Sequence, residues 1–360
     1  MISVAILTPS KAGNRFPDYY KQFIAAGREL GASVFLITPP AGGRIAEDEW
    51  RGYVSSGDGW KAASVPRPDI VINRFGRFLR SREELEDYFT FRDTSGLLFA
   101  NHTVDNKLHL FHQLCSDPEI GRQLPETVEC SADALGRMLS RYDLLYMKPK
   151  NGTGGRGIYR IERAEKSGKY RLQGHDAHRR NRISETLDRN ALIDRLAHIG
   201  EQGSFLVQQG LDLRLLPGRN ADLRLLLQKE NGNWTATGTA VRIGKRGSPV
   251  SNLHGGGTGH RSEPFLAERF GRKRSALILK ECSQLAKRVA RAIEANYGRM
   301  LELGFDLGID TQGKVWLIEV NTMPQRNLLL VTGQAKTYQL AFRRPIAEAI
   351  RLAKEEGGAM

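Results

Sequence analysis

Residues 303–321 read LGFDLGIDTQGKVWLIEVN, two apolar runs on either side of a Gln-Gly pair. Short apolar runs that flank a polar turn predict a β-hairpin. A loop of two or of four residues gives the same strand register, and the four-residue form pairs Asp310 with Val315. In that register Asp306 lies opposite Glu319 on the neighbouring strand. The hairpin is therefore expected to bring two carboxylates together, whereas a three-residue loop would separate them.

The acidic pair has a polar neighbour on the same face of the hairpin. Side chains two apart on a strand share a face, so Asn321 points the same way as Glu319, and Asp306 joins them across the ladder. Like charges that face each other destabilise a sheet unless something neutralises them. Two carboxylates and an amide provide oxygen ligands that suit Mg²⁺, which often shares phosphate oxygens. The register predicts a magnesium site at these three residues; the alternative is a solvated hairpin face with dispersed acidic residues.

A second segment, residues 148–161 with the sequence KPKNGTGGRGIYRI, is rich in glycine. Glycine lets the backbone approach a ligand closely, so that successive N–H groups converge on phosphate oxygens. The pattern G-x-G-x-x-G begins at Gly152, but a dinucleotide-binding fold requires a helix next, and the strand-like run 158–161 follows instead. No P-loop pattern occurs, and Lys148 precedes the glycines, whereas the lysine of a protein kinase follows them. We expect an anion-binding glycine hairpin; the alternative is a surface hairpin with Lys148 as an ordinary strand lysine.

The composition predicts a globular protein of two or three lobes. The chain has 360 residues, of which 40% are hydrophobic and 26% charged, enough to bury one or two ordinary cores. Its 54 Lys and Arg exceed its 40 Asp and Glu, which gives a net charge of +14. Such a charge attracts anions, among them nucleotides, carboxylates, nucleic acid and membrane phosphates, without choosing between them.

Cysteine usage and hydropathy point to a cytoplasmic protein. Cys115, Cys130 and Cys282 show no paired spacing, so neither a disulfide framework nor a zinc cluster is indicated. The apolar runs are too short for a membrane helix, which needs about 20 residues. The amino end lacks the basic start and long apolar run of a secretory signal. We expect no membrane span.

The order of the predicted elements gives an α/β lobe followed by a mixed region. Apolar runs at 4–7 and 34–37 flank a helical pattern at 19–30, which is a β-α-β start and indicates an α/β lobe over residues 1–100. Charges of both signs crowd residues 160–195. With few apolar anchors, that stretch is expected to form an exposed excursion rather than part of a core.

Further polar residues are candidates for binding an anionic substrate. Asp222 and Arg224 lie two apart on a predicted strand and are expected to present an acid and a base to one cavity; a surface ion pair is the alternative. Arg242 precedes the loop 251–257, SNLHGGG, whose backbone amides could stabilise developing negative charge. A connector without a ligand is the alternative for that loop.

Basic clusters at 179–182 and 269–274 raise the question of nucleic acid. Acidic residues interrupt the surroundings of the first cluster, and no recognisable nucleic-acid-binding motif accompanies either one. Solvated faces are the expected interpretation, and nucleic acid is an unlikely partner.

The order of these motifs resembles the ATP-grasp superfamily and, more closely, the YheC/YheD family, known as endospore coat-associated. The resemblance covers about residues 100–345. The closer likeness depends on 148–161, on Arg242-Ile243 with Ser251-Asn252, and on 310–321. The superfamily features, in order, are Lys107, Lys148 beside the glycine hairpin, FLVQQG at 205–210, Asp222-Leu223-Arg224, Asp306, and Glu319-Val320-Asn321.

The resemblance implies an ATP-grasp fold, α/β and α+β, with an N-terminal α/β lobe of the pre-ATP-grasp kind. It implies an N-terminal domain at 1–100, an ATP-grasp region with the glycine-rich lid at 101–210, and a catalytic lobe at 211–360. ATP and Mg²⁺ would be the cofactors. The implied cofactor-binding residues are Lys107 and Lys148 at the phosphates, the glycine turn with Asn151, Gly152, Gly154, Gly155 and Gly157 above them, Gln208, Gln209 and Gly210 around adenine, and Asp222.

The metal ligands implied by the resemblance are those derived from the hairpin register, namely Asp306, Glu319 and Asn321. One position departs from better-known members such as the D-alanine ligases. These carry an arginine two residues before the first metal aspartate, where this chain has Gly304. Arg224 or Arg242 would then have to supply the corresponding positive charge.

The function implied is an ATP-dependent carboxylate–amine ligase that forms an amide or peptide bond through an acyl phosphate and releases ADP. Arg224, Arg242 and Asn252 would stabilise the reacting groups, and a small-molecule or peptide carboxylate and an amine would be the substrates. The alternatives are a nucleotide-binding structural or regulatory spore protein and a small-molecule kinase. The sequence leaves the substrates and a homo-oligomer open.

Overall fold

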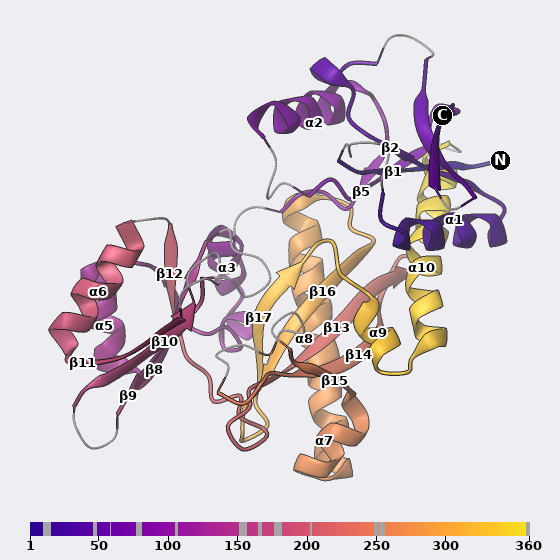
Figure 1. The fold of residues 1–360 in the computed structure, drawn as a ribbon. Coiled ribbons are helices and arrows are strands. Elements are labelled where there is room, and N and C mark those ends of the chain that lie inside the picture. The colour runs from indigo at the N-terminus through magenta and orange to yellow at the C-terminus, as the bar shows by residue number, and fades with distance from the viewer. Residues whose placement is uncertain are drawn as a thin grey trace.

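The computed structural model describes residues 1–9, 16–45, 49–57, 59–76, 81–104, 107–150, 157–164, 168–175, 182–201, 204–247, 251 and 256–357. Three β-sheets organise these residues into an N-terminal, a middle and a C-terminal lobe, and the C-terminal lobe lies between the other two (Figure 1). The expected mixture of an α/β lobe and α+β lobes is confirmed. No helix in the described ranges is long and apolar enough to cross a membrane.

The N-terminal lobe is the predicted α/β unit. Its sheet has the order β4-β3-β2-β1-β5-β6, and β1 lies between β2 and β5, parallel to both. Both faces of the sheet bury apolar side chains, because the central strands read as short Val- and Ile-rich runs. The elements are β1 (Ser3–Leu7), α1 (Tyr19–Glu29), β2 (Ser33–Ile37), η2 (Ala41–Gly43), β3 (Arg51–Ser56), β4 (Gly59–Ser64), β5 (Ile70–Asn73), α2 (Arg82–Thr94) and β6 (Phe99–Ala100).

The middle lobe is an antiparallel sheet of order β11-β10-β9-β8-β12-β7, with α5 and α6 packed on one face. Helices α3 and α4 precede it and pack into the core of the C-terminal lobe. The elements are α3 (Lys107–Cys115), α4 (Pro118–Gly121), β7 (Thr127–Glu129), α5 (Ala132–Arg141), β8 (Leu144–Pro149), β9 (Tyr159–Arg163), β10 (Tyr170–His175), β11 (Arg182–Leu187), α6 (Arg189–Glu201) and β12 (Phe205–Gln209).

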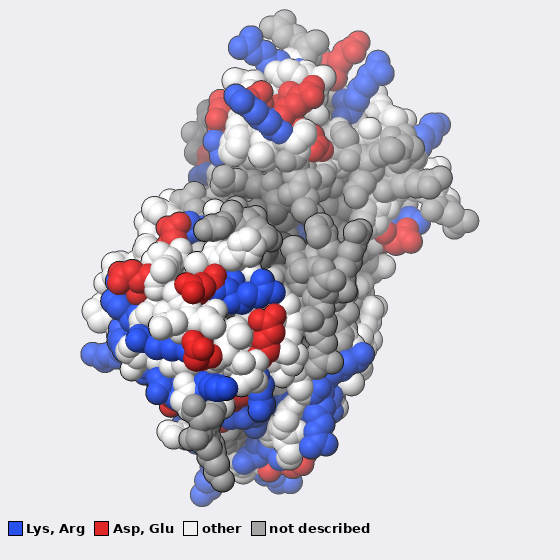
Figure 2. All heavy atoms as spheres, turned by 60° about the vertical axis from the view of Figure 1, so that its left-hand side comes forward, with Lys and Arg blue, Asp and Glu red and all other residues white. Residues whose placement is uncertain are grey.

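The expectation of an exposed excursion over residues 160–195 is wrong. The segment supplies most of β9, all of β10 and β11 and the start of α6, and Leu172 and Leu192 in it are fully buried. A sheet covered on one face needs an apolar residue only at every second position, so the intervening charges hid the strands. Those charges lie on the surface, where acidic and basic side chains are interspersed over the face that the middle lobe presents (Figure 2).

The C-terminal lobe is an antiparallel sheet of order β15-β14-β13-β16-β17. Helix α8 covers one face and buries the main apolar core against it. The opposite face carries the polar residues of the candidate site. The elements are β13 (Ala221–Glu230), β14 (Asn233–Ile243), β15 (Thr258–Arg261), α7 (Ser262–Phe270), α8 (Arg272–Tyr297), β16 (Glu302–Ile309), β17 (Val315–Asn321), α9 (Asn327–Val331) and α10 (Ala335–Gly357).

The last helix joins the C-terminal lobe to the N-terminal one. Phe342 and Ile346 of α10 are buried in the same cluster as Val4 and Ile6 of β1. In Figure 1, α10 runs beside α1 while its other end lies next to α9. The three-part division proposed from the sequence stays a prediction, since each part holds its own sheet but the packing of α3 and α10 crosses the boundaries.

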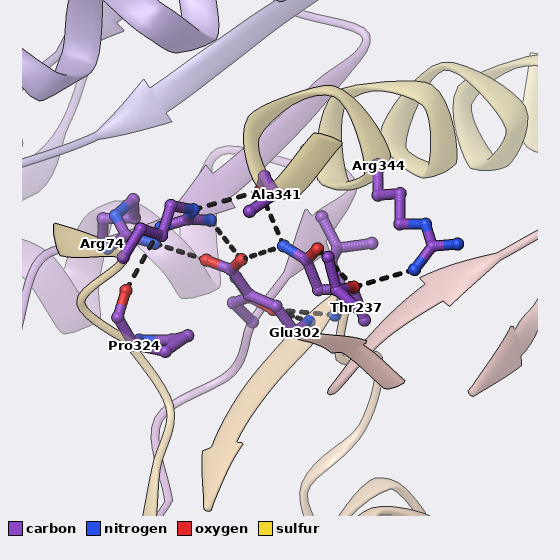
Figure 3. A network of polar contacts seen from close by, with 10 residues as sticks. Arg74, Thr237, Glu302, Pro324, Ala341 and Arg344 are labelled. Carbon is purple, nitrogen blue, oxygen red and sulfur yellow. Dashed lines mark hydrogen bonds and ion pairs between the residues drawn. The ribbon is translucent and has the colours of Figure 1, made fainter. Parts of the chain in front are cut away.

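A buried ionic triad fastens the two lobes (Figure 3). Arg74, which directly follows β5, donates to Glu302 at the start of β16 over 2.5 Å. Arg326, beyond β17, donates to the other oxygen of the same carboxylate. Gln228 of β13 also donates to Glu302, over 2.8 Å, and to the carbonyl of Ala341 in α10, over 2.7 Å. The N-terminal lobe is thus tied to the strand that carries Asp306.

The triad holds two positive charges and one negative charge away from water. Arg74, Glu302 and Arg326 expose 6%, 0% and 3% of their surface. Burial opposes ionisation of Glu302, but Arg326 and Arg74 outweigh it and keep the pKa of Glu302 below its usual value. A cation–π contact stabilises the excess positive charge of the triad: the guanidinium of Arg326 lies 4.6 Å from the ring centre of Phe342.

Glu302→Gln and Arg74→Met should therefore have unequal effects on the free energy of unfolding. The Gln variant leaves two buried guanidinium groups without a counter-charge and should lose about 3–5 kcal/mol. The Met variant leaves one neutral Glu302–Arg326 pair and should lose less. Denaturant titrations at pH 7 measure both.

The same titrations at lower pH test the cause. Since the pKa of Glu302 is lowered in the folded state, its contribution is complete above the unfolded pKa of about 4.3 and is lost as the pH falls through the folded pKa. The difference between the wild type and Glu302→Gln should narrow in acid. Equal losses for the two variants at pH 7 would show that charge balance does not hold the lobes together.

Candidate active site

The hairpin of β16 and β17 has the predicted register at its polar end. Asp306 pairs with Glu319 and Gly304 with Asn321. Near the turn the prediction that Asp310 pairs with Val315 is wrong, because Ile309 takes that place. The loop is held by Asp310, whose carboxylate accepts the backbone N–H of Lys314 at 2.9 Å.

A β-bulge explains why Asp306 pairs with Glu319 as predicted although Val315 pairs with Ile309 instead of Asp310. The register shifts between Asp306 and Leu307, where β17 carries one additional residue, Ile318. A bulge sets two residues of one strand against one of its partner. The extra residue in β17 compensates for the one-residue shift in pairing that the loop introduces, so Glu319 lies opposite Asp306. The sequence argument was right about this pair although its loop was wrong.

Two arginines from neighbouring strands hold Asp306. Arg224 of β13 is its direct cross-strand partner on the side away from Glu319, and the two side chains meet at 2.8 Å. Arg242 of β14 reaches the other oxygen of Asp306 at 2.9 Å. Asp306 exposes only 8% of its surface, so the two guanidinium groups neutralise a buried carboxylate that already faces a second acid.

Asp222 fixes the orientation of Arg242. The two residues are cross-strand partners, and Arg242 Nε donates to Asp222 over 2.6 Å. The hydroxyl of Ser251 donates to the other oxygen of Asp222. Burial works against the charge on Arg242, but Asp222 and then Asp306 outweigh it and raise its pKa above the usual value. Arg242 therefore stays charged at any physiological pH.

A side chain from the neighbouring strand lies beside Gly304. A Cβ built on Gly304 would lie 3.2 Å from Nη1 of Arg224 and 2.8 Å from Cβ of Pro324. The guanidinium of Arg224 thus occupies the space beside residue 304, reaching it from the neighbouring strand. Of the two arginines considered from the sequence, Arg224 is the one whose guanidinium lies beside residue 304. Arg242 contacts the carboxylate of Asp306 from the next strand, β14.

The oxygen donors expected for Mg²⁺ are brought together. Asp306 and Glu319 are adjacent across the ladder, and Asn321 is two residues from Glu319 on the same strand. Asn321 would offer its amide oxygen, because Nδ2, which is buried and has no hydrogen-bond partner among the described residues, is a donor and does not bind a cation. A carboxylate has lone pairs for both a guanidinium and a cation. The donor set therefore fits Mg²⁺, although no group of three or more His, Cys, Asp or Glu that could hold a metal occurs within the described ranges.

Lys148 and Gln208 lie on the facing sheet of the middle lobe. Lys148 of β8 donates from Nζ to the amide oxygen of Gln208 on β12 over 2.9 Å, and Gln208 in turn donates to Thr127 over 2.8 Å. Nζ of Lys148 also lies 5.8 Å from the ring centre of Phe111 in α3. Lys148 is thus held at the base of the glycine hairpin.

The other residues expected at adenine have clear backbone roles. The side chain of Gln209 accepts the backbone N–H of Glu126 at 3.2 Å. Gly210 donates its N–H to the carbonyl of Leu144 over 2.7 Å, and a Cβ at this position would lie 2.2 Å from Cγ of Leu144. Only glycine fits against that strand, which explains the residue type without a ligand.

Several expected residues lie outside the described part of the structure. These are Asn252 and most of the glycine turn, namely Asn151, Gly152, Gly154 and Gly155. Gly157 is described and has a φ of 65°, a conformation that favours glycine. Lys107 begins α3, but its side chain is not described.

Two polar residues on the same face of the middle sheet as Lys148 were not considered from the sequence. Tyr146 lies opposite Gln208 on the middle sheet, and its pKa is raised chiefly by burial. Arg160, opposite Tyr146 on β9, forms two hydrogen bonds of 2.7 and 2.6 Å with Glu162. Strand alternation with Lys148 was the signal that could have placed Tyr146 on the same face.

Comparisons with known proteins agree with this geometry. The family described as "YheC/D like ATP-grasp" matches residues 96–352. Endospore coat-associated protein YheD of Bacillus subtilis (strain 168) is 30% identical over 315 residues, which cover 84% of this chain and 67% of that protein. Endospore coat-associated protein YheC of the same organism is 24% identical, over 90% of this chain and 89% of that protein.

Solved structures show the same fold at low sequence identity. The ATP-grasp ligase PsnB, complexed with a minimal precursor, covers 96% of this chain and 99% of its own, with a TM-score of 0.56 and 11% identity. The D-cycloserine synthetase DcsG has a TM-score of 0.56 and 13% identity, and the match covers 96% of this chain and 99% of that chain. D-alanyl-alanine synthetase A from Vibrio cholerae O1 biovar eltor str. N16961 has a TM-score of 0.52 and 12% identity, and the match covers 97% of this chain and 98% of that chain. With the fold, the paired acids and the family match in agreement, the chain belongs to the YheC/YheD family of the ATP-grasp superfamily.

Proposed function

We propose that this protein is an ATP-dependent carboxylate–amine ligase that forms an amide or peptide bond and releases ADP. The observation that carries the proposal is the placement of Asp306 between Arg224 and Arg242, directly opposite Glu319. Membership in an ATP-grasp family supports ATP-dependent ligation at the level of the family. The bond formed and the substrates are part of the proposal.

The nucleotide would lie between the middle and C-terminal sheets. Lys148, Lys107 and the glycine turn would bind it from the middle lobe, Asp222 would lie on the side of the C-terminal sheet, and the segment Gln208 to Gly210 would meet adenine. Asp306, Glu319 and Asn321 would hold Mg²⁺, which would supply positive charge to the phosphates. The sheet's own contribution is to hold the two acids and two arginines in place before any ligand arrives.

The first step joins a substrate carboxylate to the γ-phosphorus. A carboxylate oxygen attacks, the bond to the β-phosphate oxygen breaks, and ADP leaves with that electron pair. Arg224 and Arg242 lie where negative charge spreads over the transferred group, and such preorganised cations lower its energy. No protein nucleophile takes part.

The second step forms the amide. The amine nitrogen attacks the acyl carbon, phosphate leaves with the C–O electron pair, and the amine proton ends on the phosphate. Arg224, Arg242 and the loop that contains Asn252 would stabilise the oxyanion of the tetrahedral intermediate.

The substrate class is open between a small acid and a peptide. One structural neighbour is a D-alanyl-alanine synthetase and another is bound to a precursor peptide, which supports either kind of carboxylate for this chain.

A reducing compartment suits the three cysteines, all of which are free, so we propose that the protein is cytoplasmic.

A second candidate function is favoured by the relatives' names. YheD and YheC are described as endospore coat-associated, which supports a nucleotide-binding structural or regulatory protein that forms no product. A small-molecule kinase would use the same phosphate site. Products separate the three: ADP with a new amide, ADP with a stable phosphorylated acid, or bound ATP without turnover.

Glu319→Gln should abolish Mg-dependent ATP turnover and leave the fold intact. The change removes one of two metal carboxylates but keeps size and hydrogen bonding. ADP formation with Mg-ATP and pooled acids, amino acids and peptides measures turnover, and mass spectrometry identifies condensed products. Glu263→Gln, at an exposed position of α7 in the same lobe, is the control. Near-normal turnover by Glu319→Gln would contradict the metal assignment, and AMP as the main product would exclude the acyl phosphate.

Arg224→Met should lower kcat by about 10²–10³-fold, because it removes a cation aimed at the transferred group. Arg224→Lys should retain part of the rate. Gly304→Ala introduces a Cβ that would lie 2.8 Å from Cβ of Pro324 and 3.2 Å from Nη1 of Arg224, so it should slow the wild type, and its effect should be smaller but not absent in the Arg224→Met background, where only the second conflict is removed. Steady-state kinetics of the four proteins form a double-mutant cycle, and additive effects would show that the two positions act separately.

A further inference from the structure

Helix α8 carries a row of basic side chains on the surface of the C-terminal lobe. The helix covers the sheet face opposite the candidate site, and its inner side packs into the main apolar core (Figure 1). On its outer side, steps of three or four residues keep within about 40° of one line along the helix. The residues on that line are Lys273, Leu277, Lys280, Gln284, Lys287, Arg291 and Ala295. This basic row contains four cations and no acid.

The charge of the basic row is not compensated within the part of the chain that the structure describes. Its four cations have no ion-pair partner there, and three of them are exposed. The acids around the row have partners of their own. Glu281 accepts a hydrogen bond of 2.9 Å from Gln123, Glu119 of α4 pairs with Arg288 at 2.6 Å, and Glu294 lies 2.5 Å from a lysine of β13. The row therefore presents positive charge to the solvent.

The amino end of α8 adds further positive charge to the basic row. Arg272, Lys273 and Arg274 are in the first turn of the helix, which holds no acidic residue. Because a helix dipole is positive at its amino end, cations there reduce stability. Arg274 donates to the carbonyl of Gly313 over 3.2 Å, and the next residue, Lys314, is exposed. Cations that the fold itself disfavours are better explained by contact with a negatively charged partner.

The length and shape of the basic row suit a flat anionic surface. Lys273 and Arg291 are eighteen residues apart, which is about 27 Å along a straight helix. The anionic headgroups of a fluid membrane move to meet cations at any spacing over such a length. Each Lys or Arg at a membrane surface of this kind adds about fivefold to the affinity.

An apolar side chain in the basic row separates a membrane from a nucleic acid. Leu277 lies between Lys273 and Lys280 and exposes 56% of its surface. A lone exposed Leu is ordinary by itself, but an apolar side chain among cations can reach the boundary between headgroups and acyl chains. The row holds no aromatic residue on which an unpaired base could stack. The combination of cations and Leu277 therefore favours a membrane.

We propose that the basic row of α8, together with Leu277, is a docking surface for an anionic membrane. The cations contact lipid phosphates, and Leu277 enters the boundary between the headgroups and the acyl chains. The candidate site lies on the opposite face of the sheet, so it faces away from the membrane. This inference does not depend on the proposed function.

Vesicle binding by the full chain tests the proposal. The probes are vesicles of equal parts phosphatidylglycerol and phosphatidylcholine, and vesicles of phosphatidylcholine alone, in a cosedimentation titration. Two triple variants reverse exposed cations, two Lys and one Arg, at the same spacing of seven and eleven residues on different helices. They are Lys273→Glu, Lys280→Glu and Arg291→Glu on α8, and Lys336→Glu, Arg343→Glu and Lys354→Glu on α10. Each triple variant lowers the net charge by six, from +14 to +8.

The wild type should bind the vesicles that contain phosphatidylglycerol and not those of phosphatidylcholine alone, with an affinity that falls as salt is added. The α8 variant should bind about a hundredfold less tightly, because three cations leave the contact. The α10 variant should keep most of the affinity, and thermal unfolding should change little in either, since all six positions are exposed. Equal losses in the two variants would show that net charge alone attracts the vesicles and would overturn the proposal.

Leu277→Ser tests the apolar contact at unchanged charge. It should weaken binding to the phosphatidylglycerol vesicles about fivefold, because the leucine side chain no longer leaves water, and it should not alter the salt dependence. An unaltered affinity would overturn the insertion of Leu277.

A short DNA duplex is the second probe. Duplex binding that is lost in the α8 variant, without any binding to the vesicles, would overturn the membrane proposal in favour of a nucleic acid. Vesicle binding that the duplex does not reproduce would support the membrane.

Discussion

The candidate site depends on the ion pairs that the carboxylate of Asp306 forms with Arg224 and Arg242. The same carboxylate lies opposite Glu319 on the neighbouring strand. Two acids side by side on adjacent strands repel each other, and burial makes the repulsion stronger. The arginines from β13 and β14 offset that cost without a metal. The sheet therefore assembles this cluster of charges by itself, and under the proposed function the same two arginines would stabilise the charge of a transferred phosphoryl group.

The strand that carries Asp306 is itself anchored at its other end. Glu302 lies four residues earlier on β16 and receives Arg74 from the N-terminal lobe. Asn101, at the end of β6, accepts the backbone N–H of Leu301 at 2.7 Å. The N-terminal lobe thus supports the hairpin of β16 and β17 at the start of β16. Lys148 belongs to a different sheet, so the nucleotide would be bound between a fixed base and a separately folded middle lobe.

How much the sequence could predict depended on the separation of the interacting residues. The pairing of Asp306 with Glu319 follows from alternation within one hairpin, and it survived a wrong loop because Ile318 forms a bulge that restores the register. The link between Arg224 and Asp306 needs the order of strands in the sheet, which alternation does not give. In the triad of Arg74, Glu302 and Arg326, the bonded pair Arg74 and Glu302 is 228 positions apart, beyond any local pattern.

The measurement that tests the central claim most directly is a crystal structure with Mn²⁺ and a non-hydrolysable ATP analogue. Anomalous scattering locates the manganese independently of the protein coordinates. The account predicts a peak between the carboxylates of Asp306 and Glu319, within reach of Asn321 and next to the terminal phosphates. A nucleotide bound with its manganese away from these two acids, or Asp306 still held by both arginines with no metal beside it, would contradict it.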